Sequence, residues 1–137
     1  MESRQPTIML VDDDIDFLDL NRHVLERAGY RVVCSVARSE ALASLAKEKP
    51  DLIITDLMME SLDTGFAFSR QIREDPTFRD IPIIIVTAVG SQLGFDFRPK
   101  TQDDLLAMRA DAFFEKPVAA KRLLAKIEEL LGPRKPE

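Results

Sequence analysis

The sequence predicts an α/β fold in which a doubly wound, five-stranded parallel sheet is flanked by five helices. Five short apolar runs have the length and composition of strands, and the segments between them carry apolar residues at the three- to four-residue spacing of amphipathic helices. Each connection is expected to hold a helix, which favours right-handed crossovers and parallel pairing. At 137 residues the chain fits one domain. We place this domain at residues 6–131 and a short polar tail at residues 132–137.

The five predicted strands are rich in Val, Ile, Leu and Phe. In chain order they are Thr7–Val11, Arg31–Val36, Leu52–Thr55, Ile83–Val86 and Ala112–Glu115. The first is almost wholly apolar, which is typical of a strand buried on both faces of a parallel sheet. The second ends without a reactive group, and we therefore place it at an edge of the sheet, away from any site.

The five predicted helices each have an apolar face. They run from about Phe17 to Ala28, Ser39 to Glu48, Phe66 to Glu74, Gln102 to Ala110 and Ala119 to Leu131. Acidic residues precede the first helix and Gly29 lies just past its end, both typical of helix termini. Ser39 is the predicted N-cap of the second helix, which Pro50 stops. Gly132 and Pro133 end the last helix.

Composition and charge limit the classes of function. With 45% hydrophobic and 31% charged residues the chain is typical of a globular protein, and no apolar run approaches the roughly 20 residues of a membrane span. No secretory signal is visible, and we expect a cytoplasmic protein without membrane contact. The formal charge of −5 gives no general attraction to nucleic acid, so we expect no direct nucleic-acid binding. The only cysteine, Cys34, is expected to be a small strand residue.

Four of the predicted strands end at polar side chains. Asp12 and Asp13 follow the first strand, Asp56 follows the third, Thr87 follows the fourth and Lys116 comes just after the fifth. Ligands of open α/β sheets bind outside the carboxyl ends of the strands, so we expect these groups to share one site. Three close carboxylates repel one another unless a cation joins them, and their hard oxygens favour Mg²⁺.

This set of groups suits phosphoryl transfer to a carboxylate. A metal and the ammonium of Lys116 would neutralise phosphoryl oxygens, and Asp56 could serve as the nucleophile. Taken singly, each residue has an ordinary alternative. The acidic run at residues 12–14 could be a solvated turn that caps a helix, Lys116 a surface lysine, and Thr87 a plain strand end. The combination favours a site.

In this order, the residues closely resemble the receiver domain of two-component response regulators. The Asp12–Asp13 pair, Asp56, Thr87–Ala88 and Lys116–Pro117 each follow their strand as the motifs of that family do. The resemblance covers about residues 6–131. It implies the flavodoxin-like strand order 2-1-3-4-5.

The resemblance also implies roles for the site residues. Asp56 would accept a phosphoryl group from a histidine on a partner kinase or a histidine phosphotransfer protein. Asp13 and Asp56 would coordinate Mg²⁺ together with the backbone carbonyl of Met58, and Asp12 would act mainly through water. Contacts to the phosphoryl group would come from Lys116, Thr87 and Ala88.

Activation is implied in the same way. Phe113 occupies the switch-aromatic position, and its inward move would reshape the surface of the fourth helix, fifth strand and fifth helix for an unknown protein target. A monomer and a homodimer are equally open. The Lys116–Pro117 bond would be cis, although trans is the commoner state for such bonds. We expect a signalling switch and not an enzyme.

Two stretches depart from the family pattern. Glu60 stands where the family usually has a proline, and Thr64 looks like an extra residue in the same loop. Residues 91–100 look like an insertion before the predicted fourth helix. Phe95 and Phe97, which lie in it, could pack into the core or form a partner-binding patch.

Three other classes of function remain as alternatives. A phosphatase of the haloacid dehalogenase class needs Asp-x-Asp-x-Thr or Val after its first strand, and here Asp16 stands at the last position. A nucleotide-binding module needs a glycine-rich loop, which does not follow the first strand. The serious alternative is a receiver-like interaction module that works without phosphorylation. The retained Asp56, Thr87 and Lys116 count against it.

Overall fold

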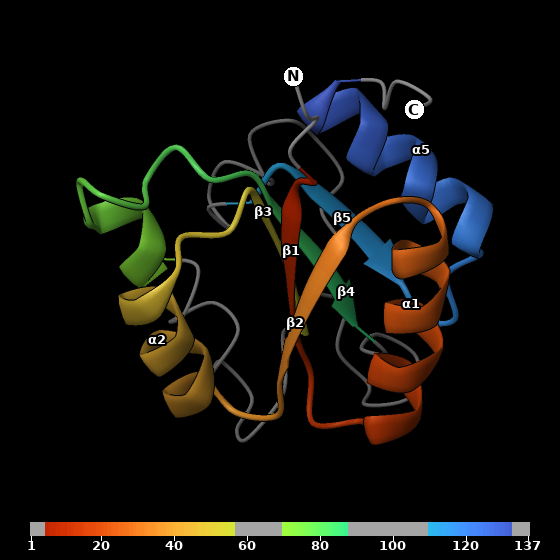
Figure 1. The fold of residues 1–137 in the computed structure, drawn as a ribbon, viewed down its shortest axis with the longest axis horizontal. Coiled ribbons are helices and arrows are strands. Elements are labelled where there is room, and N and C mark those ends of the chain that lie inside the picture. The colour runs from red at the N-terminus through yellow and green to blue at the C-terminus, as the bar shows by residue number, and fades with distance from the viewer. Residues whose placement is uncertain (1–4, 57–69, 88–109, 133–137) are drawn as a thin grey trace.

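The computed structural model describes residues 5–56, 70–87 and 110–132, in which five parallel strands form one sheet (Figure 1). The strands are β1 Thr7–Val11, β2 Arg31–Ser35, β3 Leu52–Thr55, β4 Ile83–Thr87 and β5 Ala112–Glu115. Their order is β2-β1-β3-β4-β5, and every pair is parallel. The predicted doubly wound sheet is confirmed, as is the edge position of β2.

Helices lie on both sides of this sheet. The complete ones are α1 Ile15–Arg27, α2 Arg38–Lys47 and α5 Ala120–Leu131, and residues 70–74 are also helical. The latter form the end of the predicted third helix. The rest of that helix, and the predicted fourth helix except Ala110, lie outside the described residues. Among the described residues no helix is both long and apolar enough to cross a membrane.

The ends of α1 follow from local chemistry. The Asp14 carboxylate caps the helix, because its Oδ1 accepts hydrogen bonds from the backbone N–H of Asp16 at 3.1 Å and of Phe17 at 3.3 Å. After the last turn, Gly29 adopts φ of 100°, the left-handed region that glycine enters without a steric penalty. The chain can therefore reverse at once into β2.

The predicted N-cap of α2 is wrong. Ala37 occupies the N-cap position and makes no side-chain hydrogen bond there, while Ser39 already lies inside the helix. The carboxylate of Glu40, in the first turn, instead accepts a hydrogen bond from the backbone N–H of Val36 at 2.9 Å. Glu40 thus reaches back past the N-cap to the residue before it, and among the described contacts no side chain caps the N–H groups of the helix itself.

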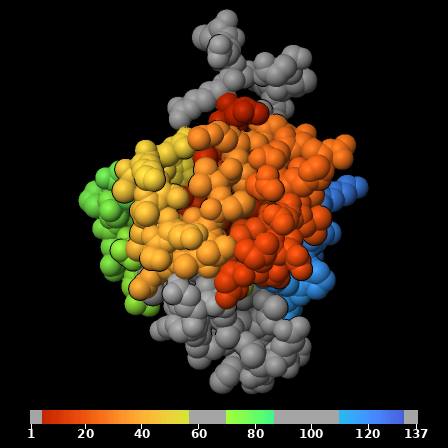
Figure 2. All heavy atoms as spheres, turned by 60° about the horizontal axis from the view of Figure 1, so that its bottom comes forward, coloured from red at the N-terminus to blue at the C-terminus, as the bar shows by residue number. Residues whose placement is uncertain are grey.

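The sheet buries apolar side chains on both faces. One face packs against α1 and α5 through residues such as Ile8, Leu10 and Ile54, whereas α2 and residues 70–74 cover the alternate residues on the other face. Space-filling atoms show the same two-sided arrangement, since residues 70–87 (green) and α5 (blue) lie at opposite margins (Figure 2). Near-continuous apolar strands are expected in a sheet covered on both faces.

Two aspartates tie neighbouring strands together at the amino edge of the sheet. Asp51 precedes β3, and its Oδ2 accepts a hydrogen bond from the backbone N–H of Thr7 in β1 at 2.7 Å. Asp111 precedes β5, and its Oδ2 accepts from the N–H of Ile83 in β4 at 2.8 Å. Arg73 holds Asp111 through an ion pair of 2.5 Å. Both carboxylates thus satisfy the first amide of a buried strand.

Replacing Asp51 by alanine is expected to lower the free energy of unfolding by about 0.5–1.5 kcal/mol, because the backbone N–H of the buried Thr7 would lose its side-chain acceptor. Urea unfolding followed by circular dichroism measures this change. Asp19→Ala is the control. Asp19 is exposed and forms a solvent-exposed ion pair with Arg22 at 3.6 Å, which contributes little, so this change should alter the free energy of unfolding by less than about 0.5 kcal/mol. Equal midpoints for the two variants would contradict the role of Asp51.

Candidate functional site

The carboxylates predicted to form a site are brought together where β1 and β3 end. These strands are neighbours, and the last paired residues are Val11 and Thr55, so Asp12 and Asp56 lie side by side directly after them. The backbone N–H of Asp56 donates to the carbonyl of Val11, and that of Asp12 to the carbonyl of Ser35, each at 3.0 Å. Regular sheet pairing therefore positions both residues.

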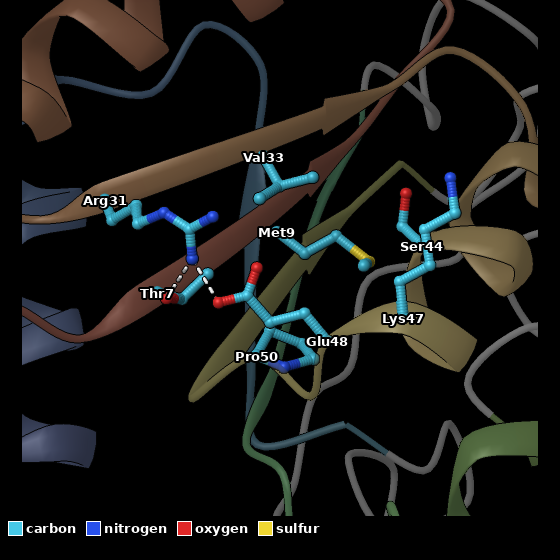
Figure 3. A pocket seen from close by; sticks show the side chains of 8 residues that line it. All are labelled: Thr7, Met9, Arg31, Val33, Ser44, Lys47, Glu48 and Pro50. Atoms are coloured by element: carbon cyan, nitrogen blue, oxygen red, sulfur yellow. Dashed lines mark hydrogen bonds and ion pairs between the residues drawn. The ribbon is translucent and has the colours of Figure 1, made fainter.

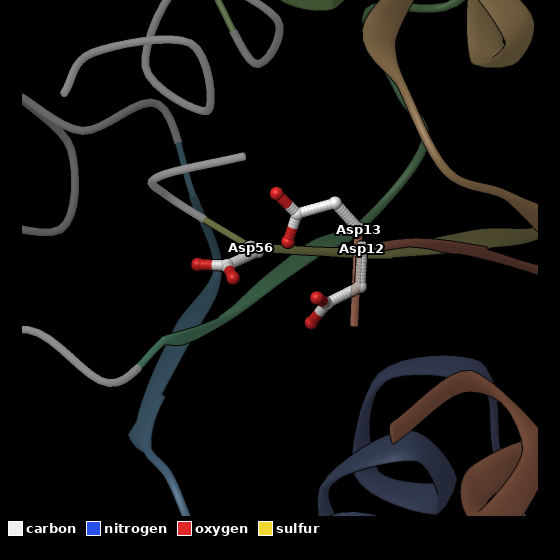
Figure 4. Close-up of side chains that lie close together, drawn as sticks. All are labelled: Asp12, Asp13 and Asp56. Carbon is white, nitrogen blue, oxygen red and sulfur yellow. The ribbon is translucent and has the colours of Figure 1, made fainter. Parts of the chain in front are cut away.

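One oxygen from each of Asp12, Asp13 and Asp56 lies within 4.8 Å of the others (Figure 4). Asp12 and Asp56 are buried, with 1% and 7% of their surface exposed, whereas Asp13 faces solvent. Asp12 Oδ1 also accepts a hydrogen bond from the N–H of Asp14 at 2.9 Å. The acidic run is thus divided, since its first two members join Asp56 and its third caps α1.

Lys116 reaches this cluster from the turn after β5. Its ammonium Nζ lies 2.8 Å from Asp12 Oδ2 and 3.4 Å from Asp56 Oδ2. Burial acts to lower the pKa of Lys116, but the hydrogen bond and charge of Asp12 and the charge of Asp56 outweigh it, and the pKa lies above its usual value. Lys116 is therefore a cation at neutral pH. The Lys116–Pro117 peptide bond is cis.

The electrostatic balance of the cluster is incomplete. Burial raises the pKa of Asp12 to about 6, against the opposing effects of Lys116 and the Asp14 N–H, and the charge of Asp56 adds to the rise. Three carboxylates and one ammonium carry two net negative charges when all are ionised. Convergent hard oxygen ligands with this charge fit a divalent cation such as Mg²⁺.

The other predicted site residues are described in part. Thr87 is the last residue of β4 and pairs with Glu115 of β5, so its backbone lies at the same edge. Its side chain lies outside the described residues, as do Met58 and Ala88. Phe113 is half-buried in β5 and packs against the core on the side of α2.

Sequence reasoning missed one neighbour of the site. The Lys116 ammonium lies over the ring of Phe17, 4.5 Å from its centroid. The sequence placed Phe17 on the apolar face of the first helix, and it does pack against the core next to α1. Its position in the first turn after the acidic run was the one available signal. Contact with Lys116 depends on how α1 packs beside β5.

A pocket away from this site lies at the opposite edge of the sheet, between α2 and the starts of β1 and β2 (Figure 3). Two of its charged groups pair with each other, since the Arg31 guanidinium contacts Glu48 and also donates to Thr7 Oγ1 at 3.5 Å. It is remote from the carboxylate cluster. Its position gives it no part in chemistry at Asp56.

The comparisons with known proteins agree with this fold. Residues 8–128 match the family model described as the response regulator receiver domain, and the chain belongs to this family. It is 34% identical, over 92% of its length, to the DNA-binding dual master transcriptional regulator RpaA of Synechocystis. The chain covers only 49% of RpaA, and it spans about half the length of the other relatives of this kind that it matches.

Solved structures show the same likeness. The chemotaxis response regulator CheY4 of Vibrio cholerae has a TM-score of 0.78 and 29% identity, with 93% of this chain and 100% of that chain covered. The receiver domain of a sensor histidine kinase from Pseudomonas aeruginosa has a TM-score of 0.77 and 25% identity over 95% of this chain and all of its own. That receiver was solved with a magnesium ion coordinated in its active site cleft.

Mg²⁺ is expected to stabilise the protein through this cluster. At ten times the dissociation constant it should raise the free energy of unfolding by about 1.4 kcal/mol, measured as a rise in melting temperature. Asp13→Asn and Asp56→Asn should remove most of the rise, because each deletes an anionic ligand. Asp14→Asn is the matched control, because asparagine still caps α1. An equal response in all three variants would place the ion elsewhere.

Protons are expected to compete with Mg²⁺. Because the raised pKa of Asp12 is about 6, its carboxyl becomes neutral as the pH falls below 6. Each further fall of one pH unit should weaken the apparent Mg²⁺ affinity by up to about tenfold, whereas the affinity should change little above pH 7. Calorimetric titration from pH 5 to 8 measures this dependence. Asp12→Asn should bind less tightly and lose the step near pH 6; an unchanged pH profile would assign it to another group.

Proposed function

We propose that this receiver domain is switched by phosphorylation of Asp56. The phosphoryl group would come from a phosphohistidine of a histidine kinase or a histidine phosphotransfer protein. One observation carries the proposal: the buried Asp56 carboxylate lies within 3.4 Å of Lys116 and converges with Asp12 and Asp13 at the ligand-binding edge of the sheet. Nothing else among the described residues combines a nucleophile, a cation and metal ligands.

The transfer is a displacement at phosphorus. An oxygen of Asp56 attacks the phosphorus atom, the P–N bond breaks, and its electron pair goes to the imidazole nitrogen, which is neutralised by a proton. Lys116 would exchange one carboxylate contact for a phosphoryl oxygen and so balance the charge that reaches Asp56. Mg²⁺ held by Asp12, Asp13 and Asp56, with the Met58 carbonyl, would neutralise phosphoryl oxygens. The chain acts here as acceptor and switch, and we propose no enzymatic activity for it.

Approach of the donor is supported by the surface of α1. Two large apolar side chains are exposed there, with 55% of Ile15 and 65% of Leu20 accessible. Leu20 lines a hollow shared with Phe17, Lys116 and Pro117, directly beside the site. We propose that the histidine-bearing protein covers this region when it reaches Asp56, since burial of these side chains would favour the complex.

The output is proposed to be a change in affinity for a protein target. Thr87 at the end of β4 pairs with Glu115 of β5, and Phe113 in β5 is half-buried. A structural change at Thr87 and Ala88 on phosphorylation would therefore pass to β5 and alter the surface that it forms with α5. A homodimer is another outcome of such a change. We propose the cytoplasm as the compartment. The expectation of no nucleic-acid binding has no support from the relatives, because RpaA is described as DNA-binding.

Incubation with acetyl phosphate and Mg²⁺ is expected to add one phosphoryl group, detected by intact mass. Asp56→Asn should take up none, and Asp14→Asn should react at the wild-type rate because it retains the helix cap. Omission of Mg²⁺ should abolish the adduct. If the wild type binds Mg²⁺ yet stays unmodified with acetyl phosphate and with histidine phosphotransfer proteins, the proposal fails and a constitutive interaction module is favoured.

A further inference from the structure

Lys116 is held on three sides. Its ammonium lies 2.8 Å from Asp12, 3.4 Å from Asp56 and 4.5 Å from the centroid of the Phe17 ring. The lysine side chain is only 15% exposed, so water surrounds little of it. The aromatic face is the one uncharged contact of the three.

The ring differs from the carboxylates in what it requires of the ammonium. A carboxylate binds one of the three N–H donors, and that bond must break before the donor can serve a phosphoryl oxygen. The negative face of an aromatic ring attracts the whole cation and leaves each donor free to reorient. Phe17 can therefore keep Lys116 beside Asp56 while its hydrogen bonds change.

Lysine by itself does not secure this position. Its four-carbon stem is flexible, and α1 offers further carboxylates nearby at Asp14 and Asp16, which line the same hollow. Phe17 lines the same hollow and also packs against the core cluster that includes Leu18 and Leu123. The ring is thus anchored on one side and open to the cation on the other.

We propose that Phe17 is a positioning residue, which holds the Lys116 ammonium where it can contact the phosphoryl group that enters at Asp56. This inference rests on the proposed function and deepens it. The ring itself touches no reacting atom. Its contribution lies in restricting where Lys116 can go, and so it should affect the rate of transfer more than the stability of the fold.

The test compares three variants with the wild type. Phe17→Leu keeps an apolar side chain in the core but removes the aromatic face, and Phe17→Tyr restores that face. Phe114→Leu is the matched control, because the ring of Phe114 packs against the same core cluster and faces a different cation, with Arg122 Cζ 5.4 Å from its centroid. The three changes separate loss of packing from loss of the contact with Lys116.

Two quantities are measured at saturating Mg²⁺. Phe17→Leu should slow phosphorylation by acetyl phosphate by about threefold to tenfold, whereas Phe17→Tyr and Phe114→Leu should remain within about twofold of the wild type. By NMR, the ε-methylene protons of Lys116 should show a ring-current shift in the wild type and in Phe17→Tyr, and lose it in Phe17→Leu. Comparison with Lys116→Arg assigns these resonances.

Several results would overturn the inference. One is a wild-type rate of phosphorylation for Phe17→Leu, and another is a rate for Phe17→Tyr that falls as far as that of Phe17→Leu. A third is an equal fall in rate for Phe114→Leu, which would indicate general loosening of the core. Absence of phosphorylation in the wild type would contradict the proposed function instead. In that case the Lys116 resonances still decide whether the ring holds the ammonium. Absence of a ring-current shift in the wild type would refute the proposed role of Phe17.

Discussion

Three carboxylates at the carboxyl ends of two neighbouring strands repel one another, and the properties of the site depend on how this repulsion is balanced. Asp12 and Asp56 are buried, so water screens their charges poorly. Lys116 neutralises one charge and leaves two when all three carboxylates are ionised, and burial, together with the charge of Asp56, raises the pKa of Asp12. A site in this condition responds strongly to an added cation or phosphoryl group, which is the sensitivity that a charge-operated switch requires.

The sheet supplies a frame that withstands this repulsion. Its central strands are buried on both faces, and at the amino edge Asp51 and Asp111 tie the first amides of neighbouring strands. At the carboxyl edge the backbone of Asp12 and Asp56 continues the ladder. Asp12 and Asp56 can therefore move their carboxylates apart mainly by turning their side chains. Apolar packing thus stabilises the fold, while the polar groups gather where the strands end and that packing stops.

Local patterns predicted most of this frame. The predicted bounds of β1, β3 and β5 agree with the structure, because apolar runs between turn residues leave few alternatives to a buried strand. The predicted N-cap of α2 was wrong because the helix already begins at Arg38, and the preference of serine for N-caps does not choose between neighbouring starting points. That choice depends on where the chain leaves β2. The predictions for Met58, Ala88 and residues 91–100 lie outside the described residues.

The order of residues along the chain was enough to predict that Asp12, Asp13, Asp56 and Lys116 would meet, because groups that follow parallel strands come to one edge of the sheet. The folded chain was needed to see how the acidic run is divided, with Asp14 as the cap of α1. It was also needed to see that the Lys116 ammonium lies over the ring of Phe17. These contacts depend on the angle and distance at which a helix packs beside a distant strand, and residue spacing along one segment carries no information about either.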